Sequence, residues 1–426
     1  MLKRRSTNRR LLFRHVCCQA IFCLALPASA QDVQHVTLTP DGRFVVDGAA
    51  TFPVGYTSGP VLGSLSPAHN TALAELKKEG YVFQLWYCPP QQWGPERESY
   101  LDALLQHSLE QGTRVVISIH DLQAIKPGEA AKAAELRRVV MKYRNHPSLL
   151  FWKGQDEPEW GKIPPEDLRT YYETIHSLDP NHPIWMTQAP RGTIDALRPY
   201  SRFYDIGAID IYPVSYPPGI HSEKGHNTEL SAVGDYTQVI RAAGDNRKTT
   251  MMVLQICWSG VTKPGKTLRF PTFPEERYMT YQAIINGARG LVYFGGNVKA
   301  CWNDQDTAYG WNWSFYNRAL RPVLDELRPD GPLYPALVAP DSKLPFQVSV
   351  KDLEFVVRES GDFIYVLAAR RESETSEVKF TGLPKVITDG NLLYEDPRAV
   401  KVLDGSFTDW FAPHEVHLYR FRRPLK

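Results

Sequence analysis

The chain has 426 residues, of which 43% are hydrophobic and 23% are charged. It can therefore bury a large core, and this composition excludes disordered, collagen-like and disulfide-scaffold proteins. The formal net charge of +2 depends on six Lys and Arg residues within positions 1–30; without that segment 43 basic and 47 acidic residues remain, a net charge of −4. A mildly acidic chain without a basic stripe argues against nucleic acid or anionic lipid as a partner.

Residues 1–30 have the pattern of a signal peptide. A basic start is followed by the apolar stretch Val16–Leu26 and by Ala28-Ser29-Ala30, the small residues that precede a cleavage site. The apolar stretch is shorter than the about 20 residues that span a membrane, and we expect no membrane span later in the chain. We therefore expect a periplasmic or secreted mature protein. Arg9-Arg10 weakly resembles a twin-arginine signal, which leaves the export route open.

From residue 44 to about residue 330, short apolar runs alternate with amphipathic stretches. Asp47-Gly48 predicts a hairpin turn before the first run. Ser66-Pro67 predicts the start of a helix that ends at Gly80. Further helices are expected at 130–144, 165–178, 229–243 and 275–287. The eight apolar runs are Phe52–Tyr56, Tyr81–Tyr87, Arg114–His120, Leu149–Gln155, Ile184–Thr187, Ile206–Tyr212, Thr249–Ile256 and Gly290–Phe294.

Eight apolar strands that alternate with helices predict parallel strands buried on both faces. The expected fold class is α/β, a closed (β/α)8 TIM barrel. A doubly wound open sheet is the alternative, but no glycine-rich turn follows the first strand.

The pattern changes near residues 328–332, where Pro and Gly interrupt the helical periodicity. Short strands are expected at 347–350, 353–358, 363–368, 377–380 and 416–421, separated by turn residues. This pattern predicts a small C-terminal antiparallel β-sandwich that braces the barrel. The expected domains are a signal peptide at 1–30, a barrel with an N-terminal hairpin at 31–332, and the sandwich at 333–426.

Carboxylates and aromatic side chains gather at the predicted carboxyl ends of the barrel strands, where barrel enzymes place their active sites. They are Tyr56, Trp86, Tyr87, His120, Asp121, Asp156, Glu157, Asp210, Tyr212, Gln255, Trp258 and Tyr293, with Trp302, Asp304 and Asp306 after the eighth strand. Aromatic faces stack on sugar rings, and carboxylates bind hydroxyls or transfer protons. Serine-hydrolase elbows, P-loops, dinucleotide fingerprints and HExxH motifs do not occur, so we expect neither a cofactor nor a metal.

The segment Tyr143–Pro158 carries the most specific pattern. Its Asn-His-Pro-Ser sequence leads into the fourth predicted strand, which ends in Asp156-Glu157-Pro158. This resembles the clan A glycoside hydrolases, the superfamily of many cellulases and β-galactosidases, in which the strand ends in Asn-Glu-Pro. Weaker similarity extends to Asp210–Pro213, to Gly287–Gly290 and to the all-β tail. The resemblance implies a carbohydrate substrate and Glu157 as the general acid/base. In the alternative interpretation, Asp156 and Glu157 are a solvated pair that caps the next helix.

Two residues depart from the family pattern. Asp156 stands where the family has an Asn that binds the sugar 2-hydroxyl. Gln255 stands where the family has its nucleophilic Glu. An amide cannot form the covalent glycosyl intermediate, so a retaining mechanism with carboxyl groups about 5–5.5 Å apart does not follow.

Three hypotheses therefore remain for the chemistry. In the first, Asp210, Asp121 or Asp304 is the second carboxylate, and a separation of about 6.5–9.5 Å from Glu157 gives inversion. In the second, an N-acetylhexosaminide supplies its own acetamido nucleophile, because the pair Asp156-Glu157 is similar to the β-hexosaminidase arrangement. In the third, the barrel binds sugar without cleaving it.

The sequence thus predicts an exported glycoside hydrolase that cleaves a polysaccharide or oligosaccharide. Glu157 is the expected acid/base, Asp156 and Gln255 position the sugar, and Asp210 is the first candidate for the second carboxylate. The expected substrate-binding residues are Trp86, Tyr87, His120, Asp121, Tyr212, Trp258, Tyr293 and Trp302. These residues specify neither the sugar, the linkage nor the oligomeric state.

Overall fold

Eight parallel strands form a closed barrel in the computed structural model, which describes residues 36–78, 80, 83–215, 227–256 and 269–423. The signal-peptide prediction for residues 1–30 lies outside these residues. The strands are β4 (Val54–Tyr56), β5 (Phe83–Cys88), β6 (Arg114–Ile119), β7 (Leu149–Asp156), β8 (Ile184–Gln188), β9 (Ile206–Ile211), β10 (Thr249–Gln255) and β11 (Leu291–Phe294). β11 pairs with β4 and so closes the barrel. The predicted TIM barrel is confirmed, strand by strand.

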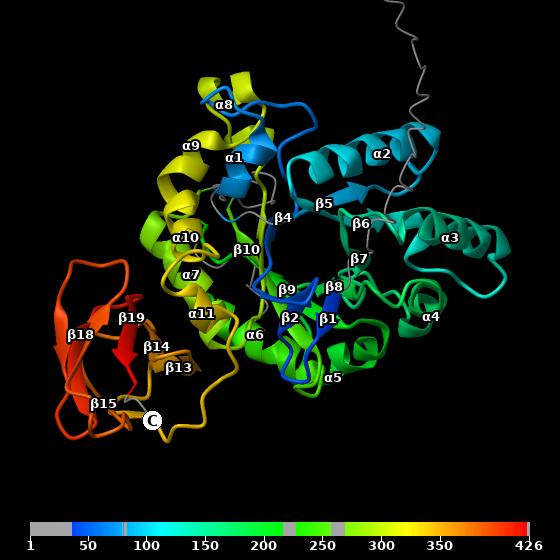
Figure 1. Cartoon of the computed structure of the whole chain (residues 1–426). Coiled ribbons are helices and arrows are strands. Elements are labelled where there is room, and N and C mark those ends of the chain that lie inside the picture. The colour runs from blue at the N-terminus through cyan, green and yellow to red at the C-terminus, as the bar shows by residue number, and fades with distance from the viewer. Residues whose placement is uncertain (1–35, 79, 81–82, 216–226, 257–268, 424–426) are drawn as a thin grey trace, which may run out of the picture. The chain divides into compact units, whose positions relative to one another are not determined.

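Helices surround the barrel (Figure 1). The longer ones are α2 (Pro95–Glu110), α3 (Ala130–Tyr143), α4 (Arg169–Leu178), α6 (Ala232–Ala243) and α7 (Phe273–Ile285). Short helices are α1 (Ala72–Lys78), α5 (Ile194–Leu197), α8 (Asp304–Tyr309), α9 (Trp313–Phe315), α10 (Arg321–Glu326) and α11 (Tyr334–Leu337). Shorter 3-10 segments cover His120–Leu122, Pro165–Leu168, Arg198–Phe203 and Lys299–Cys301, and a π-helical segment covers Tyr316–Leu320. No helix in the described part of the chain is both long and apolar enough to cross a membrane.

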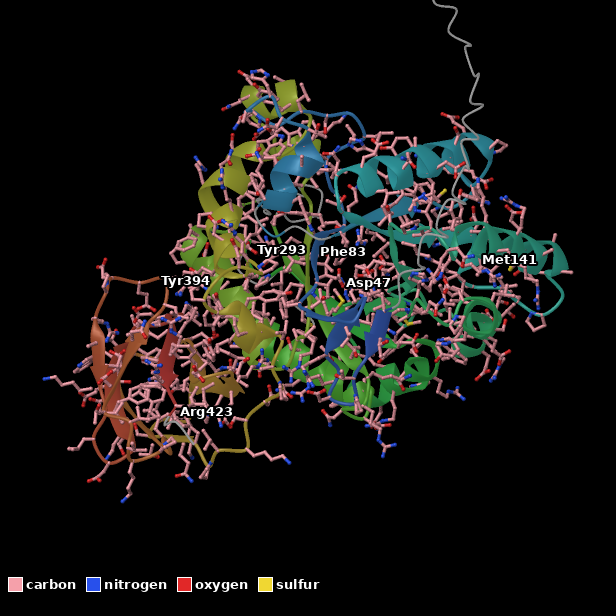
Figure 2. The ribbon with its side chains drawn as sticks, in the orientation of Figure 1. Asp47, Phe83, Met141, Tyr293, Tyr394 and Arg423 are labelled. Atoms are coloured by element: carbon pink, nitrogen blue, oxygen red, sulfur yellow. The ribbon has the colours of Figure 1, made fainter. Side chains whose placement is uncertain are left out.

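The barrel strands are buried because each one packs on two sides. Inside the barrel, the ring of Phe83, labelled in Figure 2, lies 5.9 Å from that of Phe151 and 6.5 Å from that of Trp185. Trp152, the next residue on β7, points the other way, and its Nε1 donates to Asp179 at 2.7 Å. A strand with apolar neighbours on both faces needs a continuous apolar sequence, which explains why the runs predicted the strands.

A small antiparallel sheet precedes the barrel. It consists of β1 (Val36–Leu38), β2 (Phe44–Val46) and β3 (Ala49–Thr51). Asp47 and Gly48 have φ values of 51° and 78°, as the two central residues of a type I′ hairpin turn require. The predicted hairpin is confirmed.

The predicted start of the first helix, at Ser66-Pro67, is wrong. Ser66 instead begins a tight turn, in which its carbonyl accepts from the His69 N–H at 2.8 Å and its N–H donates to Asn70 at 2.8 Å. α1 begins only at Ala72. Ser and Pro favour turns as well as helix starts, and here the turn prevails.

The tail forms two antiparallel sheets, as predicted. One contains β12 (Gln347–Val348), β15 (Ser376–Thr381) and β18 (Ser406–Phe411); the other contains β13 (Leu353–Ser360), β14 (Phe363–Arg370), β19 (Val416–Arg422), β16 (Asp389–Leu392) and β17 (Ala399–Lys401). Phe407 joins them, because its ring stacks on Phe380 at 4.5 Å and lies 5.1 Å from Phe421 of the other sheet. The strands β16, β17 and β18 were not predicted.

Polar contacts attach these sheets to the barrel helices. Gln282 of α7 donates to Glu354 of β13 at 2.8 Å, and Arg371 donates to Asp235 of α6 at 2.9 Å. The buried guanidinium of Arg358 donates to the carbonyl of Ala336 in α11 at 3.1 Å. The tail therefore packs against the α6, α7 and α11 side of the barrel.

Candidate active site at the carboxyl ends of the strands

A cavity of about 550 Å³ opens at the carboxyl ends of the barrel strands. Its polar and aromatic lining consists of Thr57, Ser58, Gln84, Trp86, Tyr87, Arg97, Tyr100, Ser118, Lys153, Asp156, Glu157, Thr187, Asp210, Tyr212, Phe294 and Asn297. The structure thus brings Asp156, Glu157, Asp210, Trp86, Tyr87 and Tyr212 of the sequence prediction around one cavity.

Glu157 follows the end of β7 directly and has a left-handed backbone, with φ of 43°. This conformation costs a residue with a side chain about 1–2 kcal/mol. Two hydrogen bonds hold it: the Glu157 N–H donates to the Thr187 carbonyl of β8 at 2.8 Å, and the Glu157 carbonyl accepts from the Gly161 N–H at 2.9 Å. The backbone is therefore fixed where the half-buried carboxyl lines the cavity.

Glu157 and Asp210 form a hydrogen-bonded carboxyl pair. Burial raises the pKa of Asp210 well above its usual range, and the charges of Glu157 and Asp156 raise it further. Burial also raises the pKa of Glu157, with the Asp156 charge as the second cause. Because two carboxylates in contact resist ionising together, the pair holds a proton to a higher pH than either acid would alone.

Asp156 is paired with a buried cation. The Lys153 Nζ lies 2.9 Å from the Asp156 Oδ1, and the Asp156 side chain remains 57% exposed. Lys153 also lies over the Trp185 ring, with its Nζ 5.1 Å from the ring centroid. The ion pair fixes one Asp156 oxygen and leaves the other for a ligand.

Gln255 is not placed as the sequence predicted. Its side chain is fully buried, and it does not belong to the described cavity lining. Its Oε1 accepts from the Val214 N–H at 2.9 Å, and its Nε2 donates to the Val214 carbonyl at 2.6 Å. Since the Val214 backbone engages both ends of this buried amide, its position does not support the predicted role of Gln255 in positioning sugar. The residue instead ties the end of β10 to the segment after β9.

The predicted aromatic residues divide into two groups. Trp86, Tyr87 and Tyr212 line the cavity, where the Tyr212 ring stacks on Phe294 at 5.1 Å and Tyr87 is 43% exposed. The Tyr293 side chain, labelled in Figure 2, is buried, and its hydroxyl lies 2.9 Å from the Thr280 Oγ1 of α7. Tyr293 therefore faces the helix layer, and its predicted contact with substrate is wrong.

Four further predicted residues lie outside the described cavity lining. The Asp121 carboxylate accepts from the Gln91 N–H at 2.8 Å, and His120 contacts Gln155 at 3.4 Å. Asp304 begins α8, and the Trp302 ring lies under the Lys299 ammonium at 6.0 Å. None of the four belongs to the described cavity lining, and their roles in the second carboxylate position or in substrate binding stay predictions.

Trp258, the last of the predicted substrate-binding residues, lies outside the described residues. Several residues of the cavity lining were not predicted from the sequence. Arg97 and Tyr100 were missed because they come from α2 rather than from a strand end. Gln84 and Lys153 were missed although a polar residue within an apolar run is itself a signal. No group of three or more His, Cys, Asp or Glu side chains in the described part of the chain is arranged to hold a metal ion.

The fold is similar to those of solved carbohydrate-active proteins. A structure described as a glycoside hydrolase is 13% identical over 92% of this chain and 97% of its own, with a TM-score of 0.61. A glycoside hydrolase family 5 protein from Bacteroides vulgatus is 11% identical over 91% and 93% of the two chains, with a TM-score of 0.59. A maltogenic α-amylase from Thermotoga neapolitana is 11% identical over 87% and 99%, with a TM-score of 0.54.

At these identities the similarity establishes a shared fold. No protein-family model matches the chain, and no curated protein matches it. The chain therefore has the TIM-barrel fold of glycoside hydrolases, with a carboxyl pair at the mouth of the barrel.

Proposed function

We propose that the protein is an exported glycoside hydrolase that cleaves O-glycosidic bonds in a polysaccharide or oligosaccharide. The observation that carries this proposal is the Glu157 carboxyl, which lines an aromatic-walled cavity, has a raised pKa and is hydrogen-bonded to buried Asp210. A glycosidic leaving group needs a proton, and a carboxyl with a raised pKa supplies it near neutral pH. The similarity of the fold to glycoside hydrolases supports the same conclusion.

In this mechanism Glu157 protonates the leaving oxygen, and Asp210 positions the Glu157 carboxyl. The Glu157 charge contributes, after burial, to the raised pKa of Asp210, and Asp210 thereby helps to keep a proton on the carboxyl pair. Asp156 is the third carboxylate in the cavity lining, and its second oxygen accepts a hydrogen bond from the sugar. In an N-acetylhexosaminide that donor is the acetamido N–H, and the acetamido oxygen attacks the anomeric carbon as the bond to the protonated leaving oxygen breaks. In a sugar without an acetamido group, a water molecule attacks the anomeric carbon and gives up its proton to a carboxylate of the site.

The test is hydrolysis of a panel of polysaccharides and aryl glycosides that includes N-acetylhexosaminides. We expect Glu157→Gln to lower kcat by about 10²–10⁴-fold, the usual contribution of a general acid, while substrate binding remains. Glu159→Gln is the matched control, because Glu159 is two residues further on and lies outside the described cavity lining. Full activity of Glu157→Gln would contradict the assignment of Glu157.

A carbohydrate-binding protein without hydrolytic activity is the second candidate function. Gln255 favours this function, because an amide stands where the clan A enzymes have a nucleophilic carboxylate. The amide is also hydrogen-bonded to the Val214 backbone. The same panel separates the two functions. Binding without hydrolysis in the parent protein, at every pH from 4 to 8, would establish the second.

A further inference from the structure

The inner surface of the cavity contains three hydrogen-bond donors on neighbouring strands. They are Gln84 of β5, Ser118 of β6 and Lys153 of β7, which are 4%, 2% and 3% exposed. Ile117 pairs with Trp152, so Ser118 and Lys153, which follow them, lie side by side on the same face of β6 and β7. Gln84 alternates with Phe83 and Leu85, which pack in the barrel interior, so its side chain leaves β5 on the other face, beside Gly59. None of them has a role in the proposed proton transfer.

Lys153 keeps donor capacity after its known contacts are counted. An ammonium has three N–H donors and no acceptor. One donor reaches the Asp156 Oδ1 at 2.9 Å, and the carbonyl of Gly154 lies at 3.4 Å, a long hydrogen bond. A buried ammonium is costly unless charge and hydrogen bonds compensate it. Its place in the cavity lining gives a ligand access to the remaining N–H.

Ser118 adds a donor next to Lys153, and Gln84 adds one elsewhere in the cavity lining. The Gln84 Nε2 is buried and has no hydrogen-bond partner among the residues that the structure describes, which is an unfavourable state unless a ligand or water accepts from it. The Ser118 Oγ accepts from the Gln123 Nε2 at 2.9 Å, so its O–H is left to donate. A Cβ at Gly59 would lie 2.5 Å from the Gln84 Oε1, and this close approach holds the Gln84 amide in place.

A second cation lines the same cavity from another element. Arg97 belongs to the first turns of α2, and its guanidinium is hydrogen-bonded to the Gln92 Oε1. It takes part in no ion pair with any described residue, whereas Lys153 pairs with Asp156. The cavity therefore presents two cations in addition to the carboxyl groups that cleavage requires.

We propose that this cavity binds a sugar residue that carries a carboxylate, a uronic acid, and that Lys153 and Ser118 receive that carboxylate while Arg97 attracts the anionic chain. A carboxylate is an acceptor-only group with two oxygens, so it matches a surface made of donors. Charge-assisted hydrogen bonds of this kind are about twice as strong as neutral ones. The inference rests on the proposed carbohydrate site at Glu157 and names its substrate class.

Binding to the Glu157→Gln protein tests the inference independently of hydrolysis. Isothermal titration calorimetry compares oligosaccharide pairs that differ only in a CH2OH or a carboxylate, such as glucose with glucuronic acid and galactose with galacturonic acid units. We expect at least one uronate to bind about tenfold more tightly than its neutral partner. Equal affinity in both pairs, tighter binding of the neutral sugars, or no binding of any of them would overturn the inference.

Two variants in the Glu157→Gln background test the assigned residues. Lys153→Met conserves volume, and we expect it to abolish the preference for the uronate; Lys126→Met, an exposed lysine away from the cavity, is its control and keeps the preference. Arg97→Met changes an exposed side chain and so leaves the fold intact. We expect it to weaken uronate binding severalfold and to leave neutral sugars unaffected.

A uronate preference that survives in both Lys153→Met and Arg97→Met would overturn the inference. If Lys153→Met does not fold, the uronate preference of Arg97→Met alone decides whether the inference holds. Failure of the proposed function gives a different result. A parent protein that binds uronates selectively but hydrolyses none of the panel would refute the hydrolase and support the uronate site.

Discussion

At the scale of single residues, Asp156 sets the pH range in which Glu157 holds its proton. Its negative charge is the second cause, after burial, of the raised pKa of Glu157. A general acid works only while protonated, so kcat/KM falls as the pH rises through that pKa.

Asp156→Asn removes this charge and leaves Lys153 uncompensated, and both changes favour ionised Glu157. We expect the alkaline limb of the pH profile of kcat/KM to move to lower pH. Asp121→Asn, outside the described cavity lining, is the control and leaves the limb in place. An unchanged limb in Asp156→Asn would show that Glu157 is not the titrating acid.

Glu276 shows the opposite situation, a buried carboxyl without a function in the site. It is completely buried in α7, and neither of its oxygens has a hydrogen-bond partner among the described residues. Burial raises its pKa well above the usual range, with the Glu275 charge as a smaller cause. The folded protein therefore keeps a proton that the unfolded chain releases.

Stability should consequently fall as the pH rises above the ordinary Glu pKa, about 4.3, towards the raised value in the folded state. Glu276→Gln has no such proton. We expect it to match the parent near pH 4 and to exceed its free energy of unfolding by at least about 1 kcal/mol at pH 8. Urea denaturation at pH 4 and at pH 8 measures the free energy of unfolding of both proteins. A difference between Glu276→Gln and the parent that is the same at both pH values would refute the explanation.

At the scale of elements, apolar runs were sufficient to predict all eight barrel strands. Each strand is covered on both faces, so its sequence is mostly apolar and the prediction needs no tertiary information. The strands of the tail were harder to predict from the sequence. Strand β16 contains Gly390, and β17 has only three residues. Such segments become strands because β19 pairs with β16 and β16 pairs with β17, which local sequence does not encode.

The site was predictable where it depended on position along a strand. Glu157, Asp210 and Tyr212 follow from the rule that barrel sites lie at the carboxyl ends. Gln255 satisfies the same rule, but the Val214 backbone occupies its amide. That contact depends on where the segment after β9 runs, and a sequence pattern does not record it. Lys153, in contrast, was detectable as a charge inside an apolar run.

At the scale of the whole molecule, the tail and the barrel share a buried polar interface. The Arg358 guanidinium is completely buried; it binds Asp341 at 3.1 Å and donates to the Ile284 carbonyl of α7 at 3.5 Å. Asp341 also binds Arg289, next to β11 of the barrel, at 3.0 Å. Burial lowers the pKa of Arg358 to about 10, still high enough for a full charge at neutral pH.

Removing this cation leaves buried acceptors unpaired. We expect Arg358→Met to lower the free energy of unfolding by about 3 kcal/mol, measured by chemical denaturation. Arg318→Met, at an exposed position, is the control and should change stability by less than about 0.5 kcal/mol. A loss no larger than that of the control would show that the interface does not depend on Arg358.

The origin of the cavity wall has a consequence for how this protein changes over evolution. Arg97 and Tyr100 come from α2, which a short connection joins to β5, whereas Glu157 and Asp210 belong to β7 and β9. Arg97, which we propose attracts the anionic chain, thus lies on a different piece of the chain from the proposed proton donor, whereas Lys153 shares β7 with the residues that precede Glu157. Replacing the first turns of α2 would change the outer part of the proposed ligand site without disturbing the proposed proton donor.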